Sequence, residues 1–288
     1  MKKLLIVLCC ILALQSCNNG NTGIETVNGF DINWSGNLNQ KEQQAIKDMI
    51  SNMVKVEAGT FYMGAQKDSE EQNNYDENAT SLESPVHEVT LSEFYINKYE
   101  VTQALWKAIM GKHNDKKDDF DQWEERFGKG DNYPAYRISF NDVELFIATL
   151  NEYTGLNFTL PTEAQWEYAA RGGKNANYEF IYAGSNVVTD VAWIDQNSDK
   201  CSEIGKKMPN SLGLYDMSGN VWEMCQDWYY EYKNNAVTNP VGEAYNTGHK
   251  VFRGGSWNTN AQSARTTARY QQGIHYRDYN TGFRLVIE

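Results

Sequence analysis

Five cysteines are the residues of this chain best suited to redox or soft-metal chemistry, since a thiolate is both a nucleophile and a copper ligand. They stand at positions 9, 10, 17, 201 and 225, and none follows Cys225. Cys201 and Cys225 are candidates for a disulfide in an oxidising compartment. Spacing alone does not show whether their Cα atoms approach closely enough, so this pairing is left open.

The histidines indicate a chemical site less clearly than the cysteines do. His87, His113, His249 and His275 show no close two-histidine spacing. An iron site built from His249, His275 and a carboxylate is conceivable, so iron is left as unknown.

The first segment predicts export. Met1-Lys2-Lys3 precedes an apolar run, Leu4–Leu14, that is too short to cross a bilayer as a helix. Leu14-Gln15-Ser16-Cys17 matches the lipobox of bacterial lipoproteins. We therefore expect residues 1–16 to be removed as a signal peptide and Cys17 to be lipidated; a plain signal peptide and an uncleaved anchor are the alternatives. The lipid would hold the protein to a membrane of the bacterial cell envelope, on the periplasmic side or at the cell surface.

The helices and strands that would position these residues are expected to be short. Residues 17–53 are expected to be a lipidated tether, over 18–40, followed by an amphipathic helix over 40–53. Residues 54–288 are expected to form one domain. Capping patterns predict helices over 102–110, 141–153 and 162–171. Strand-like segments are 54–57, 60–63, 86–91, 94–96, 158–160 and 251–253, and the acidic stretch 67–83 is expected to be a solvated loop.

Composition limits the class of protein. The chain has 288 residues, 22 of them Gly, and its aromatic fraction is 13%. This predicts an α+β domain with little regular secondary structure. The formal net charge of −12 argues against a broad basic face, so no nucleic-acid partner is expected.

Seven segments, in order along the chain, resemble the formylglycine-generating enzyme family, also called the sulfatase-modifying-factor domain. They are Gly59–Gly64, Pro85–Val89, Tyr99–Thr102, Leu160–Gly173, Asn210–Glu223, Arg253–Trp257 and Gly282–Leu285. The resemblance implies a single irregular α+β domain with this family's fold, which is related to C-type lectin-like folds.

The resemblance also implies a calcium site. Its ligands would be the side chains of Asp216 and Glu223 and the backbone carbonyls of Gly219 and Val221. Hard oxygen ligands around a glycine turn suit Ca²⁺. The alternative is that Asp216 only hydrogen-bonds within a tight turn.

The family's aerobic enzymes oxidise a substrate cysteine with two cysteines of their own, which bind copper. Here the first of those positions falls on Thr259 and the second on Ala261 or Ala264. Hydroxyl and methyl groups cannot replace thiolates in copper chemistry. Copper is therefore not expected, and whether the protein is an enzyme is left open.

Three functions remain. The favoured one is a non-catalytic envelope lipoprotein that binds an exported protein, peptide or glycan. The second is an oxidase or modifying enzyme with unusual ligands, and the third is a diversifiable lectin-like binding protein that uses residues 258–280. The residues expected to contact a ligand are Trp257, Asn258, Thr259, Asn260, Arg265 and Arg269, although both arginines are also expected to bridge buried carboxylates.

Overall fold

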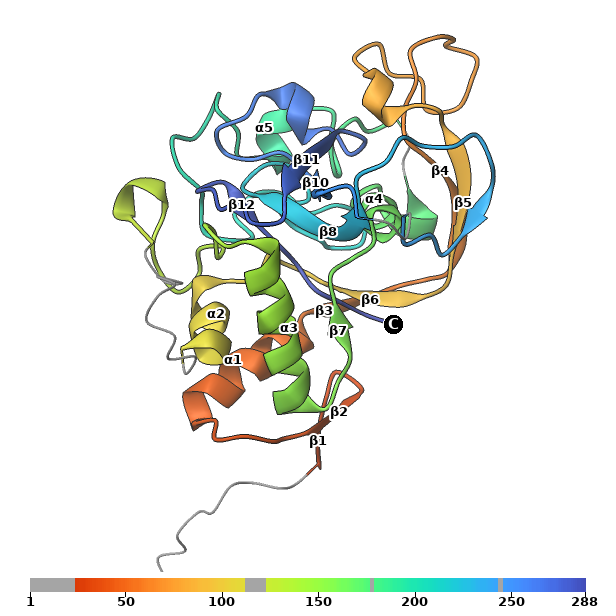
Figure 1. The fold of residues 1–288 in the computed structure, drawn as a ribbon. Helices are drawn as coiled ribbons and strands as arrows, with labels where there is room; N and C mark the ends of the chain where they lie inside the picture. The colour runs from red at the N-terminus through yellow and green to blue at the C-terminus, as the bar shows by residue number, and fades with distance from the viewer. Residues whose placement is uncertain (1–23, 112–122, 177–178, 243–245) are drawn as a thin grey trace, which may run out of the picture.

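The computed structural model describes residues 24–111, 123–176, 179–242 and 246–288. Its helices gather mainly at one end of the molecule and its largest sheets at the other and in the middle (Figure 1). The helices are α1 (Gln40–Ser51), α2 (Gln103–Met110), α3 (Phe140–Thr154), α4 (Glu163–Ala170) and α5 (Val188–Val191). This mixture of short helices and short strands confirms the predicted α+β class.

The strands form four small sheets. Their orders are β1-β2, β11-β10-β8-β12, β3-β6-β13-β7 and β4-β5-β9. The bounds are β1 (Ile24–Val27), β2 (Phe30–Asn33), β3 (Met53–Val56), β4 (Gly59–Met63), β5 (His87–Leu91), β6 (Phe94–Asn97), β7 (Phe158–Thr159), β8 (Trp222–Trp228), β9 (Val237–Thr238), β10 (His249–Arg253), β11 (Arg269–Gly273), β12 (Thr281–Gly282) and β13 (Val286–Ile287).

The four longer helices begin at residues that cap them. Asn39, Thr102, Ser139 and Thr162 each accept a hydrogen bond from a backbone N–H of the first turn. Such a bond satisfies a donor that has no partner within the helix. The helices predicted over 40–53, 102–110, 141–153 and 162–171 are thereby confirmed to within a few residues.

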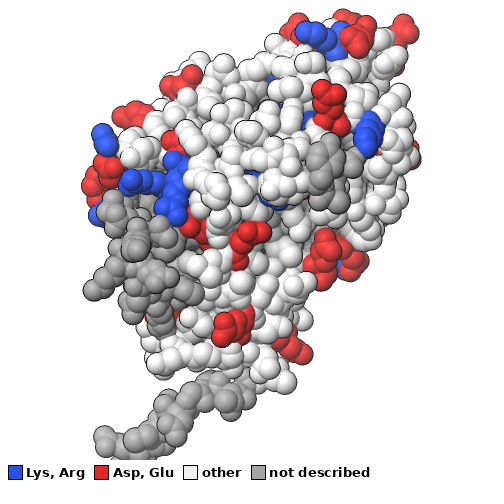
Figure 2. Space-filling view, viewed as in Figure 1, with Lys and Arg blue, Asp and Glu red and all other residues white. Residues whose placement is uncertain are grey.

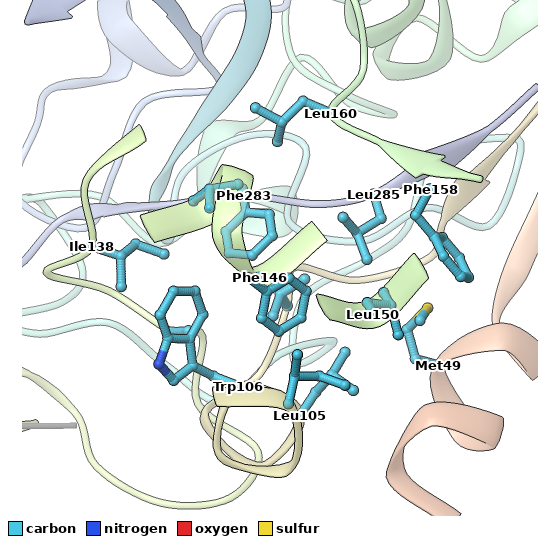
Figure 3. Close-up of a cluster of buried hydrophobic side chains, with 14 of the residues drawn as sticks. Met49, Leu105, Trp106, Ile138, Phe146, Leu150, Phe158, Leu160, Phe283 and Leu285 are labelled. Carbon is cyan, nitrogen blue, oxygen red and sulfur yellow. The ribbon is translucent and has the colours of Figure 1, made fainter. Parts of the chain in front are cut away.

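A hydrophobic core joins α1, α2 and α3 to the C-terminal strands. In this core the rings of Trp106 and Phe146 stack at 5.2 Å, and each meets Phe283 edge to face. Figure 3 shows these rings together with Leu150 and Leu285. Aromatic pairs in such geometries add to the stability that burial provides.

The strand β8 lies between two cores. Trp222 and Met224 belong to the core around α2 and α3, whereas Cys225 belongs to a second core that includes α4. Both faces of β8 are therefore buried, and its polar side chains Glu223 and Asp227 lie on the α4 side, where they contact Trp166 and the backbone of Glu163.

The N-terminal part differs from the expected tether. Residues 24–33 form the β1–β2 hairpin, and Ile32 and Trp34 are buried in the same core as α2 and α3. Ile32 and Trp34 lie among many polar neighbours in the sequence, so their burial in the core could not be predicted from the local composition. Residues 24–53 are thus part of the folded body, and Cys17 and residues 1–23 lie outside the described residues.

The acidic stretch 67–83 also differs from expectation at its end. Most of it is exposed, but Glu83 is 1% exposed and pairs with Arg265. A buried carboxylate needs such a partner to offset its desolvation. This stretch is therefore a surface loop whose last residue lies in the interior.

Charged residues are dispersed on the face shown in Figure 2, with small groups of Lys and Arg between Asp and Glu. Among the described residues, no helix is long and apolar enough to cross a membrane.

Candidate functional site

A sharp turn after β10 positions the segment in which the sequence resemblance puts the family's cysteine positions. Gly254 and Gly255 have φ values of +92° and +75°, a region that favours glycine. A Cβ atom on Gly255 would lie 2.8 Å from the carbonyl oxygen of Ser263. The turn therefore packs directly against the short 3-10 helix Ala261–Ala264.

Hydrogen bonds hold this turn closed. The Thr259 hydroxyl donates to the carbonyl oxygen of Ser256 at 3.0 Å and accepts from the Ser256 N–H at 2.9 Å. The Asn258 side-chain oxygen accepts from the Ser256 hydroxyl at 2.9 Å and from the Asn280 amide at 2.8 Å. Thr259, onto which the sequence resemblance puts the family's first cysteine position, thus stabilises the turn.

The ligand-contacting residues predicted within the turn differ in exposure. Asn258 and Asn260 are exposed, and Thr259 is half-buried. Trp257 is buried, and its indole N–H donates to the carbonyl oxygen of Tyr279 at 3.3 Å. Of these four side chains, the two asparagines are the most available to a ligand.

Both predicted arginines are buried in ion pairs. Arg265 donates to both oxygens of Glu83 and to Asp76 at 2.7–2.8 Å. Arg269 donates to both oxygens of Glu163, and its guanidinium lies 3.8 Å from the centre of the Tyr232 ring. A ligand that bound either guanidinium would have to break these buried ion pairs. The structure therefore supports the interpretation that the two arginines bridge buried carboxylates.

Glu223, a predicted calcium ligand, is buried against a guanidinium. One of its oxygens accepts from Arg284 at 2.6 Å, and the other accepts from Arg284 and from the Trp166 indole, each at 2.7 Å. Arg284 is itself fully buried. The carboxylate is thus already neutralised by a cation of the protein.

Asp216, Gly219 and Val221 lie in the turn that leads to β8. The Oδ2 atom of Asp216 accepts from the Gly205 N–H at 2.7 Å, while its Oδ1 atom is buried without a hydrogen-bond partner. Gly219 has a φ of +79°, and the Val221 N–H donates to Glu100 at 3.2 Å. Glu100 belongs to the segment Tyr99–Thr102, which resembles the family, but the sequence did not show that it would contact this turn.

Glu100 completes a cluster of three buried carboxylates around one arginine. It accepts from the Asn220 amide at 2.6 Å. Burial raises the pKa of Glu100 well above its ordinary value, and the charges of Asp216 and Glu223 raise it further. Burial likewise raises the pKa of Asp216 to about 6. The cluster has more negative charge than Arg284 can balance.

The four predicted calcium ligands fit this arrangement only in part. Asp216 Oδ1 is a hard oxygen without a partner, as a metal ligand would be, but both oxygens of Glu223 are bound by Arg284 and Trp166. No three or more His, Cys, Asp or Glu side chains among the described residues are arranged to hold a metal. That finding does not test a set with two carbonyls, so calcium stays a prediction and no chemistry is derived through it.

Cys201 and Cys225 are free thiols in different cores. They therefore form no disulfide with each other. Burial raises the pKa of both thiols, and the Cys201 thiol donates to the carbonyl oxygen of Phe127. Neither is arranged as a reactive thiolate, which needs access and nearby positive charge.

A second polar region escaped the sequence analysis. Asp227, at the end of β8, and Tyr232 line a cavity of about 240 Å³ beside α4. Asp227 is 5% exposed although it is ionisable. A signal was present in the sequence, because an aspartate within the aromatic run Trp222–Tyr232 must either reach solvent or have a structural reason to be buried.

Comparison with known proteins agrees with the fold. Residues 38–288 match the family described as the sulfatase-modifying factor enzyme 1-like domain. The solved structure of PvdO from Pseudomonas aeruginosa superimposes with a TM-score of 0.68 and 26% identity, covering 82% of this chain and 94% of that one.

Two curated relatives differ in what their names describe. A protein of Paenibacillus barcinonensis named chaperone protein LppX is 33% identical over 61% of this chain and 73% of its own length. The formylglycine-generating enzyme of Mus musculus is 25% identical over 83% of this chain and 76% of its own length. Because the family match extends over most of the sequence, this protein belongs to the family of sulfatase-modifying factor enzyme 1-like domains.

Proposed function

We propose that this protein is an envelope lipoprotein, attached through Cys17, whose domain binds an exported protein or peptide without generating formylglycine. The membrane would be reached through the lipid, since the described helices do not span one. The proposal concerns both place and activity, and each part has its own support.

The observation that carries the proposal is the composition of the turn after β10. The sequence resemblance puts the family's first cysteine position on Thr259 and the second on Ala261 or Ala264. The Thr259 hydroxyl is bound to Ser256, and either alanine offers only a methyl group. Neither side chain can bind copper or exchange with a substrate thiol. The two remaining candidate thiols, Cys201 and Cys225, are buried in separate cores.

The turn is nevertheless suited to recognition. Asn258 and Asn260 are exposed, and because their side-chain oxygens already accept hydrogen bonds within the turn, it is their NH₂ groups that can donate to a ligand. Tyr270, on the edge strand β11, is 42% exposed. Amide and phenol groups of this kind suit the backbone and side chains of a peptide. The name of the Paenibacillus relative, a chaperone, further supports a protein partner.

Site-specific cross-linking tests the proposal. A photo-reactive amino acid is placed at Asn258 or Asn260 of residues 18–288, and at exposed Lys41 on α1 as a matched control, and envelope extract is added. We expect one exported protein to cross-link at both asparagines and not at Lys41. That protein, once purified, should bind the Asn258→Ala, Asn260→Ala double variant at least about tenfold more weakly.

Three results would contradict this function. They are equal cross-linking at Lys41, cross-linking only to glycans, and unchanged affinity of the double variant.

A further inference from the structure

A cavity whose lining includes no residue of the turn after β10 opens beside the N-terminal end of α4. It has a volume of about 240 Å³ and lies among the N-terminus of α4, β5, the end of β8 and the loop that follows β8. Met63, Ala164, Val237 and Pro240 supply apolar walls. Its rim includes the exposed Glu231 and Asn235, so a solute can enter from solvent.

Asp227 lies in this cavity with one oxygen unused. Its Oδ2 atom accepts from the Glu163 N–H at 2.8 Å. In the part of the chain that the structure describes, its Oδ1 atom has no hydrogen bond and Asp227 has no ion pair. The side chain is nevertheless 95% buried, since its residue is 5% exposed. Because that oxygen faces the cavity and is not sealed from solvent, it is free to accept a hydrogen bond from a solute.

Neighbouring carboxylates show what Asp227 lacks. Glu163 is paired with Arg269 at 2.6 Å, and Glu167 is paired with Arg253 and Arg171. The pKa of Glu163 is lowered although burial opposes this, because Arg269 and Arg253 stabilise its charge. Among the described residues no guanidinium forms an ion pair with Asp227, although the charge of Arg269 acts on it from a greater distance.

The charged groups around Asp227 come from every element that packs on it. Glu163 on α4 is paired with Arg269 on β11. Lys250 on β10 donates to the Gln226 carbonyl oxygen at 2.7 Å and lies 3.8 Å from the centre of the Trp228 ring.

The remaining titratable groups of the lining come from β5 and from the loop after β8. His87 on β5 has its Nδ1 atom 3.1 Å from the carbonyl oxygen of Pro85. Glu231, Tyr232 and Lys233 of the loop also line the cavity. Burial, together with the charge of Glu163, raises the pKa of Asp227 to about 7.

We propose that this cavity binds a primary ammonium group on a short apolar stem, with the ammonium against Asp227 Oδ1 and the stem against Met63, Ala164, Val237 and Pro240. A charged donor gives the unused oxygen the strong hydrogen bond that it lacks. An anion would instead meet an unpaired carboxylate. A lysine side chain and the amino terminus of a peptide share this chemistry. The site is independent of the function proposed for the turn.

Binding to the site follows the ionisation of Asp227. Only the carboxylate attracts an ammonium group strongly, so affinity for a lysine side chain rises from pH 6 to pH 8. With a pKa of about 7, the ionised fraction, and with it the affinity, grows about tenfold over this range. A variant at Asp227 shows whether this pH dependence belongs to that carboxylate.

Calorimetric titration of the full domain, residues 18–288, with three small amides tests the proposal. Nα-acetyl-lysine methylamide offers only a side-chain ammonium, norleucine methylamide only an α-ammonium, and Nα-acetyl-norleucine methylamide neither. We expect one of the two amines to bind at pH 7 at least about tenfold more tightly than the neutral amide. Which amine binds distinguishes a lysine side chain from a peptide amino terminus.

Two variants complete the test. Asp227→Asn keeps the acceptor for the Glu163 N–H and should lose amine binding at least tenfold, together with the pH dependence of the lysine compound. Asp190→Asn removes the same charge from an exposed position and should leave affinity within twofold. Equal binding of the neutral amide, no binding of either amine, or unchanged binding by Asp227→Asn would overturn the proposal. If Asp227→Asn does not fold, a flat affinity of the unaltered protein between pH 6 and pH 8 would overturn it as well.

Discussion

Buried carboxylates paired with guanidinium groups dominate the interior of this protein at the scale of single residues. Glu83 meets Arg265, Glu163 meets Arg269, and Glu223 meets Arg284. Each pair offsets the cost of removing two charges from water only while both partners are present. Arg265, Arg269 and Arg284 therefore act as structural residues that balance buried carboxylates.

Loss of Arg284 should be among the most damaging single changes. Arg284→Met would leave Glu100, Asp216 and Glu223 buried without a counter-charge, and we expect unfolding free energy to fall by about 3–5 kcal/mol. Denaturant unfolding measures this. Lys55→Met is the control, because its pair with Glu93 is exposed, and it should have no measurable effect. Equal effects of the two changes would contradict the role given to Arg284.

Asp227 should make stability depend on pH. Its pKa in the folded protein, about 7, lies above the ordinary 3.8, so the folded state holds a proton that the unfolded chain releases. Stability from this group is complete below pH 4 and is lost as pH rises to 7. Between pH 5 and pH 8 the unaltered protein should lose about 3 kcal/mol relative to Asp227→Asn. Parallel curves of unfolding free energy against pH for the two proteins would refute this.

Calcium can be tested at Asp216 with less disturbance than at Glu223. If the ion binds there, added Ca²⁺ should raise the melting temperature, because a ligand that binds only the folded state stabilises it. Asp216→Asn, which keeps an acceptor for the Gly205 N–H, should reduce that rise. Identical melting of the chelated and the calcium-loaded protein would mean that no ion binds.

At the scale of elements, most helices could be predicted from their capping residues. The central strand β8 could not be recognised, because both of its faces are buried. The capping box at Thr162 marks the start of α4 in the sequence. The helix α1 was instead predicted from the helical period of its apolar residues, and its cap at Asn39 is seen in the structure. In contrast, β8 lacks alternation because Trp222 and Met224 face one core while Glu223 and Cys225 face another. Alternation identifies strands with one wet face, and β8 has none.

The turn after β10 should depend on glycine for space as well as for conformation. Gly255→Ala would bring a Cβ to 2.8 Å from Ser263, whereas Gly248 has a similar φ, +83°, and no atom within 4 Å. Both variants cost about 1 kcal/mol for the left-handed backbone, and Gly255→Ala should cost about 1–3 kcal/mol more. Thermal or denaturant unfolding compares them. An equal loss would mean that the turn relaxes without strain.

At the scale of the whole molecule, the candidate sites are made of residues far apart in the sequence. Glu100 meets Asn220 and Val221, and Arg265 meets Asp76 and Glu83. The sequence resemblance includes both Glu100 and Asn220, and Arg265 was predicted to bridge a buried carboxylate, but none of these residues could be given its partner. The partners Glu100 and Glu83 could not be assigned, since nothing local in the sequence tells which buried charge a folded chain will bring to which arginine.

The central claim is that a domain of this family has here a binding role without cysteine oxidation. The most direct measurement is the mass of a cysteine-containing sulfatase peptide after incubation with residues 18–288, O₂ and copper or iron. A family enzyme that retains its cysteines serves as the positive control. The account predicts an unchanged peptide with either metal, because the sequence resemblance puts Thr259 and an alanine, Ala261 or Ala264, at the cysteine positions, and Cys201 and Cys225 are buried. Conversion of the peptide cysteine to formylglycine would contradict it.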